Sequence, residues 1–384
     1  MGLFRSGTSG IACLTIYNSA LHSHELDSEQ VATVLVSCCT GRKMLSKLAP
    51  RLLPCLFFAL IVILASFTFL KQRAATSSSH ILSNLRLPST SHTANSNHAR
   101  FAFVTFQAQY PGPNGPVPDD EDSYYIGTRT LVYQLRHSPE TRINSFIDLI
   151  VLATPDVSQS KRERLEKDGA TVLTVSVPKN DWATTDKPRW RDALAKLRVF
   201  ELTQYEKILM IDSDMLLVKR LDGIFDDEAT NLLKPLADSS TADEGHLPAE
   251  YMLAAQTIQN QRVHPYPPEY GSYFSSGFFL LKPSHEIFDY YVSLMSLPGR
   301  FDPQIMDQNL LNYAHRRDGP MPWTEMTYTW TTTWPTEKEY EMGAASLHEK
   351  WWRDDMPDLS TKLRGMWLKE RWEMEGFYRG REEA

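Results

Sequence analysis

The chain contains 384 residues, of which 42% are hydrophobic and 23% are charged, and its formal net charge is −7. This composition is that of a globular protein, and the length accommodates one large domain or two modest ones. The negative net charge argues against a general nucleic-acid-binding protein.

The N-terminal part contains an apolar run rather than a globular pattern. Residues 52–70 carry no charge, and this run is long enough to span a membrane as a helix. Lys and Arg are more frequent before the run than after it, which predicts a cytoplasmic N-terminus and an exported remainder. A long cleaved signal peptide is the alternative interpretation. The predicted organisation is a cytoplasmic tail, a transmembrane anchor, a flexible stem rich in Ser, Thr and Asn, and a globular domain, at residues 1–51, 52–70, 71–99 and 100–384.

Two further features concern the same N-terminal part. All four cysteines lie at or before Cys55, so no disulfide is expected in the exported portion. Met44 stands just before the basic flank of the apolar run, and the sequence leaves open whether translation starts there or at Met1.

Beyond the stem, strand and helix signals alternate. Short apolar runs rich in β-branched and aromatic residues predict strands at 100–108, 146–154, 171–177 and 207–211. Amphipathic segments predict helices at 124–138, 159–169 and 192–205, the second capped by Ser158 and ended by Gly169. This β-α-β-α order predicts an α/β domain whose mostly parallel sheet is covered on both faces.

Asp212 and Asp214 follow directly after the predicted strand 207–211. In parallel sheets, ligands bind at the carboxyl ends of strands. If the chain is extended there, residues i and i+2 point to the same side, so the two carboxylates flank one point. Such oxygen ligands suit Mg²⁺ or Mn²⁺. A solvated turn, in which both aspartates cap backbone groups, is the alternative.

From residue 101 to residue 352 the sequence resembles the glycogenin-like branch of glycosyltransferase family 8. The similar blocks occur in the family's order: FAFVTF, DSYYIG, IVLATPDVS, ALAKLRVFELTQYEKILMIDSD, FSSGFFLLKPS, DQNLLN and LHEKWW. The resemblance is strongest with fungal type II membrane members, which include Golgi N-acetylglucosaminyltransferases. It implies the GT-A nucleotide-sugar-binding fold, a UDP-sugar donor, a divalent cation and retention of anomeric configuration.

The resemblance also implies roles for individual residues. His348 would be the third metal ligand beside Asp212 and Asp214. Lys196, Asp307 and Gln308 would be catalytic, near the anomeric carbon and the donor phosphates. Donor contacts would come from Thr105, Tyr124, Lys187, Asp212, Ser213, Asp214, Ser275, Ser276, Gly277 and Lys350.

Three positions depart from the family's pattern. Ser275 replaces an Asn that touches the transferred sugar, which leaves the identity of that sugar open. Lys187-Pro188 replaces Arg-Pro and cannot grip a phosphate in a bidentate way. After His348, the family's pyrophosphate-binding Gly has no counterpart.

The sequence therefore predicts a metal-dependent retaining glycosyltransferase of the Golgi membrane with a lumenal catalytic domain. Its partners would be a UDP-sugar and a glycan or glycoprotein acceptor, while its oligomeric state is open. The segment before His348 has no clear match to the self-glucosylated segment of glycogenins, so an external acceptor is expected. Either a carboxylate such as Asp307 attacks covalently or the acceptor enters on the leaving-group face. A catalytically decayed glycan-binding or scaffolding protein and a metal-dependent phosphohydrolase are the competing interpretations.

Overall fold

The computed structural model describes residues 100–112, 115, 117–236, 241–356 and 358–383. The predicted tail, anchor and stem lie outside these residues. Within them, no helix combines the length and the apolarity needed to cross a membrane. The domain from residue 100 onward is described below.

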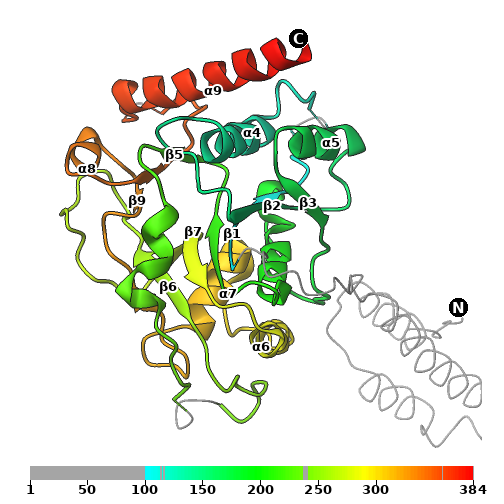
Figure 1. Cartoon of the computed structure of the whole chain (residues 1–384). Coiled ribbons are helices and arrows are strands. Elements are labelled where there is room, and N and C mark those ends of the chain that lie inside the picture. Colours follow the sequence, from blue (N-terminus) through cyan, green and yellow to red (C-terminus); the bar gives the residue numbers. More distant parts are fainter. Residues whose placement is uncertain (1–99, 113–114, 116, 237–240, 357, 384) are drawn as a thin grey trace, which may run out of the picture. The chain divides into compact units, whose positions relative to one another are not determined.

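The main sheet has seven strands in the order β3-β2-β1-β4-β7-β6-β8. All strands run parallel except β7, which is antiparallel to both of its neighbours (Figure 1). The prediction of a mostly parallel sheet is therefore confirmed. The strands are β1 (Phe101–Gln107), β2 (Ile147–Ala153), β3 (Thr171–Thr174), β4 (Lys207–Ile211), β6 (Leu253–Thr257), β7 (Phe274–Leu281) and β8 (Thr324–Glu325).

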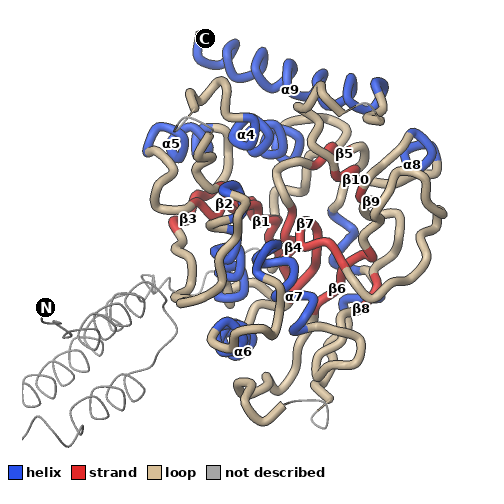
Figure 2. The backbone as a smooth tube through the Cα atoms, turned by 180° about the vertical axis from the view of Figure 1, so that it is seen from behind, coloured by secondary structure: helices blue, strands red, loops and turns tan. Residues whose placement is uncertain are grey.

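Alternating side chains of the strands form a core on each face of the sheet. On one face, Phe103 and Leu209 pack with residues of the helices α4 (Ser123–Arg136) and α5 (Gln159–Lys167). On the other face, Val104 and Met210 pack beneath a different set of helices. That set comprises the 3₁₀ helix η3 (Ala193–Glu201), α6 (His285–Met295) and α7 (Met306–Ala314). Figure 2 shows the same arrangement from behind.

Local signals set several helix boundaries. The Ser158 side chain accepts a hydrogen bond from the Lys161 backbone and begins α5, as predicted, while Gly169 follows α5 with a φ of 108°. The helix predicted at 192–205 is present over a shorter range, as the 3₁₀ helix η3. An amphipathic pattern over so few turns does not distinguish 3.0 from 3.6 residues per turn.

A second, three-stranded sheet has the order β5-β10-β9. It consists of β5 (Met215–Leu217), β9 (Thr332–Thr333) and β10 (Ser346–His348). In its register, His348 lies opposite Met215, the residue after Asp214. This pairing brings a side chain from late in the chain to the end of β4. The short helix α8 (Glu337–Glu341) lies between β9 and β10 in the sequence.

The C-terminal helix α9 (Thr361–Glu382) packs against α4 (Figure 1). Trp367 is fully buried, as expected for a core position, whereas Trp372 is 59% exposed. The Tyr378 hydroxyl donates a hydrogen bond to the Asp168 carbonyl and fastens the end of α9 to the turn after α5.

Candidate metal centre and cleft

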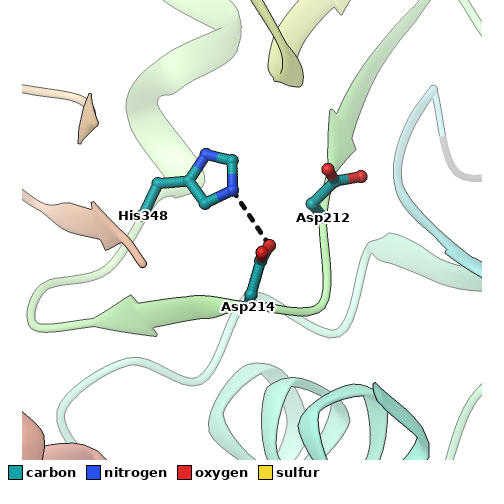
Figure 3. Close-up of side chains that lie close together, drawn as sticks. All are labelled: Asp212, Asp214 and His348. Atoms are coloured by element: carbon teal, nitrogen blue, oxygen red, sulfur yellow. Dashed lines mark ion pairs between the residues drawn. The ribbon is translucent and has the colours of Figure 1, made fainter. Parts of the chain in front are cut away.

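Asp212, Asp214 and His348 converge at the carboxyl end of β4 (Figure 3). Each offers one ligand atom, and these atoms all lie within 4.8 Å of one another. His348 Nε2 lies 3.0 Å from Asp214 Oδ1. The two aspartates occupy a turn between β4 and β5, so the expectation of an extended chain there was wrong. They face one point nevertheless, because the turn folds both carboxylates towards β10.

The donor set fits a hard divalent cation of the Mg²⁺ or Mn²⁺ type, since it combines two carboxylates with an imidazole. Two atoms of the set, Asp214 Oδ1 and His348 Nδ1, are buried without a hydrogen-bond partner. Buried polar atoms are normally bonded, and those left unbonded cost free energy. A cation at this point would offset that cost.

Gly277 leaves room for the three ligands. As the strand antiparallel to β4, β7 brings its first residues beside the end of β4, and the Asp212 backbone donates a 2.8 Å hydrogen bond to the Gly277 carbonyl. A Cβ on Gly277 would lie 2.4 Å from His348 Cε1 and 2.9 Å from Asp212 Oδ2. Any side chain at this position would displace a candidate ligand.

Lys350 adds positive charge on the other side of Asp214. Its ammonium group donates a hydrogen bond to Asp214 Oδ2 and lies 5.0 Å from the centre of the Tyr124 ring. Burial alone would raise the pKa of Asp214, but the neighbouring His348 and Lys350 outweigh it and hold that pKa well below its usual range. Asp214 is therefore a carboxylate at neutral pH.

A second pair of charges adjoins Asp212. Lys196 Nζ lies 2.7 Å from Asp212 Oδ1 and 3.4 Å from Asp307 Oδ2. Burial lowers the pKa of Lys196, but the attraction of the two carboxylates dominates and raises the pKa above its ordinary value. Burial raises the pKa of Asp307, against the lowering effect of Lys196. Lys196 is thus a fixed cation between two acidic groups.

Gln308 and the Ser-Ser-Gly segment are joined by backbone contacts. Asp307 and Gln308 lie in the first turn of α7. The Gln308 side chain accepts a 3.1 Å hydrogen bond from the Ser276 backbone and donates one of 3.1 Å to the Tyr273 hydroxyl. The Ser275 hydroxyl accepts a hydrogen bond from the Gly277 backbone. The sequence-predicted residues of β7 and α7 are therefore brought together.

These groups form the floor of a cleft made of two adjoining cavities. The inner cavity, of about 400 Å³, is lined by Lys196, Asp212, Ser213, Ser276 and Asp307. The outer cavity, of about 580 Å³, is lined by residues that include Ser275, Glu349, Trp352 and Arg353. Residues common to both are Tyr110, Tyr124, Arg189, Asp214, Ile258, Gln308, Trp334, His348 and Lys350.

Three predicted donor residues line neither cavity: Gly277, which lies beneath the candidate ligands, Thr105 and Lys187. Thr105 is fully buried in β1 and lines neither cavity, because its side chain shares the face of Phe103. The residues that follow it, Phe106 to Tyr110, line the inner cavity instead. Lys187 is exposed and pairs with Asp186 at 3.8 Å. At both places, residues a few positions further along the chain line the cleft instead.

Sequence reasoning missed three groups in the cleft wall. Arg189, two residues after Lys187, lines both cavities and supplies the guanidinium that the Lys187 position lacks. The Pro188-Arg189-Trp190 run was a usable signal for it. Trp352 ends the block LHEKWW but was assigned no role there, and Trp334 belongs to none of the similar blocks, so only the fold places it at the cleft.

Comparisons with known proteins bear on the class of this domain. No protein-family model matches the chain. An uncharacterized protein of Schizosaccharomyces pombe is 29% identical over 68% of this chain and 77% of its own length. Human Glycogenin-1 is 30% identical over 50% of this chain, which corresponds to 45% of its own length. These similarities support the glycogenin-like glycosyltransferase class that the sequence motifs predicted.

A solved structure of the galactosyltransferase LgtC, in complex with donor and acceptor sugar analogs, is similar over 71% of this chain and 95% of that chain. It has 15% sequence identity and a TM-score of 0.40.

Proposed function

We propose that residues 100–384 form a GT-A domain that transfers a sugar from a UDP-sugar to a glycan or glycoprotein acceptor, with retention of configuration. The observation that carries the proposal is the convergence of Asp212, Asp214 and His348 beside Lys196 and Asp307 on the floor of one cleft. The similarity to glycogenins supports the reaction class.

The ligand atoms of Asp212, Asp214 and His348 would hold Mn²⁺, or Mg²⁺ in its place. A bound cation supplies neutralisation of the negative charge that develops on a diphosphate leaving group. Lys350 and Lys196 add fixed positive charge on either side of the aspartates. These cationic groups would together stabilise UDP as it departs.

The remaining groups divide the cleft by position. Tyr110 and Tyr124, with rings 5.6 Å apart, stand on the β1 side, where a uracil base and ribose would bind. Asp307 and Gln308 face the inner cavity and would contact the transferred sugar. Asp307 stays close to Lys196, which favours its ionised form against the effect of burial.

The test is turnover by the purified full-length protein with UDP-glucose, UDP-galactose and UDP-N-acetylglucosamine, with Mn²⁺ or with EDTA. The proposal predicts UDP release from one of these donors that depends on the cation. Binding of UDP without turnover would favour the decayed scaffolding protein. Release of inorganic phosphate would favour the phosphohydrolase.

The proposal extends to location in the cell. The basic residues before the apolar run 52–70 support a type II anchor in the Golgi membrane, with residues after 71 in the lumen. Protease added to sealed Golgi vesicles should spare the domain from residue 100 onward. Its digestion in intact vesicles would contradict this orientation.

A further inference from the structure

Trp334 lies beside the candidate metal centre on the wall opposite Tyr124. In the second sheet Thr333 pairs with His348, so Trp334 follows directly at the carboxyl end of β9, next to a metal ligand. Its side chain lines both cavities together with Ile258, which follows β6. Since β1 and β6 stand on opposite sides of β4 and β7, the cleft has a Tyr124 wall and a Trp334 wall.

The backbone of Trp334 is held in a conformation that large side chains avoid. Its φ is 53°, and among the described residues it is the only non-glycine residue in the left-handed region. A bulky residue in the left-handed region costs free energy and persists only when its surroundings enforce it. Such positions gather at binding and active sites, so this one points to a use for the ring.

Arg262 helps to hold Trp334 in place. Its guanidinium lies 5.2 Å from the centre of the Trp334 ring and forms a 2.8 Å ion pair with Glu349, the neighbour of His348. The side chains of Arg262 and Glu349 are both largely buried, with 11% and 8% of their surfaces exposed. One face of the Trp334 ring is therefore backed by a fixed cation, which orients the ring.

The other tyrosine and tryptophan rings that line the outer cavity, Tyr110, Tyr124 and Trp352, are engaged with aromatic neighbours. Trp352 lies 5.0 Å from Tyr124 and 6.1 Å from Trp367, and Tyr124 lies 5.6 Å from Tyr110. Among the described residues, Trp334 has no aromatic partner, and 39% of its surface is exposed. Trp334 is thus the unpaired ring among the tyrosines and tryptophans described at the outer cavity, whereas Phe106 and Trp190 line only the inner cavity.

We propose that Trp334 is a stacking platform for a pyranose ring of the acceptor. The C–H face of a sugar is apolar and packs on an aromatic face, while its hydroxyl groups stay free for hydrogen bonds. Gln308, at the same cleft, is placed for such bonds. The inference rests on the proposed function for the identity of this sugar as acceptor, but the binding site itself stands on the geometry of Trp334.

The first test measures sugar binding rather than activity. Saturation-transfer NMR on the full-length protein with UDP and Mn²⁺ would use lactose, maltose and N,N′-diacetylchitobiose as probes. We expect at least one probe to bind, and Trp334→Ala to weaken it at least tenfold. Trp334→Phe should retain most of the affinity, which excludes misfolding as the cause. Trp372→Ala is the matched control, because Trp372 is also exposed with an arginine 4.9 Å from its ring but lies on α9, away from the cleft.

Equal affinity in the wild type and Trp334→Ala would overturn the platform, as would the absence of binding by all three probes. A second readout keeps the proposed function separate. If the wild type hydrolyses a UDP-sugar, Trp334→Ala should lower the ratio of transfer to hydrolysis at least tenfold, and an unchanged ratio would count against the platform. Binding through Trp334 without any donor turnover would instead contradict the proposed transferase while leaving the platform intact.

Discussion

Two clusters of buried charge in this domain differ in how completely their atoms are bonded. Asp168, at the end of α5, is fully buried, and both of its carboxylate oxygens accept hydrogen bonds from arginines, Arg129 at 2.7 Å and Arg164 at 2.9 Å. Asp214, at the cleft, is also buried and pairs with Lys350 through Oδ2, but its Oδ1 has no hydrogen bond, although His348 Nε2 lies 3.0 Å away. Asp307 Oδ2 and His348 Nδ1, which lie near Asp214, are also buried without a hydrogen bond.

This difference distinguishes charged groups that stabilise the fold from charged groups at a candidate ligand-binding site. Around Asp168 the arginines and the Tyr378 hydroxyl tie α4, α5 and α9 together, and nothing is left to bind. At the cleft, by contrast, buried polar atoms lack hydrogen bonds, and one of them, His348 Nδ1, lies where a side chain on Gly277 would reach. The first arrangement stabilises the fold, whereas under the proposed function the second would be completed by a cation and a substrate.

The largest expected effect is on turnover, from Asp214→Asn. The substitution keeps the shape but removes a charged ligand, so the rate should fall on the order of 10²–10³. The unfolding free energy without metal should fall less than in Asp168→Asn, because the Lys350 side chain is 31% exposed and can turn to solvent when its partner loses its charge. Donor turnover and urea unfolding of the same preparations check this. An unstable variant with metal-dependent transfer intact would show that Asp214 is structural.

Asp168→Asn should do the reverse and lower stability by about 3 kcal/mol, since it leaves Arg129 and Arg164 without their partner. This figure is at the low end for buried pairs because 17% and 26% of the two arginine side chains are exposed to solvent. Turnover per folded molecule should match the wild type. Urea denaturation measures the unfolding free energy. Active-site titration combined with turnover gives the activity per folded molecule. A stable variant with lost activity would remove the contrast between the clusters.

Gly277→Ala should cost about 10²-fold in turnover, because the added Cβ must push His348 or Asp212 by roughly 1 Å. Gly365→Ala is the matched control. Gly365 lies inside α9 with open space around its Cβ position, so alanine there should raise stability by about 1 kcal/mol and leave turnover unchanged. Equal activity of the two variants would mean that the space at Gly277 is not needed.

His315 provides a smaller effect that depends on pH. It is fully buried between the Tyr291 hydroxyl and the Met321 carbonyl, and burial lowers its pKa from 6.5 to about 4. Below pH 6.5 His315 is protonated in the unfolded chain, whereas in the folded chain it stays neutral down to about pH 4. Stability should therefore fall by about 2 kcal/mol between pH 7 and pH 5. Urea unfolding at both values should show a smaller fall in His315→Gln, and an equal fall would contradict this role.

Local patterns were sufficient for the elements of the sheet but not for the second sheet. The buried runs at β1, β2 and β4 and the caps of α5 involve neighbours in sequence, and they were predicted within a few residues. The proximity of His348 to Asp214 depends on the pairing of β10 with β5 across more than a hundred residues. No local pattern encodes that pairing, and only the family resemblance indicated it.

Where the sequence misplaced side chains relative to the cleft, the reason is the direction in which they point. Motif positions specify where a side chain leaves the backbone, while the direction in which it points depends on the alternation of the strand and on the loop that carries it. Thr105 points into the core for the first reason. Lys187 points to solvent for the second, and Arg189 lines the cleft instead. The position of the Trp334 side chain depends on a left-handed backbone conformation that the neighbouring sequence does not predict.

Direct measurement of Mn²⁺ binding tests most sharply whether the unbonded atoms at the cleft await a cation. Electron paramagnetic resonance of Mn²⁺, titrated with the full-length protein in the presence of UDP, reports free and bound ion separately. The wild type and Asp168→Asn should bind one Mn²⁺ with similar affinity, while Asp214→Asn and His348→Ala should bind it at least tenfold more weakly. Equal binding by all four proteins, or no binding by the wild type, would contradict a metal centre at Asp212, Asp214 and His348.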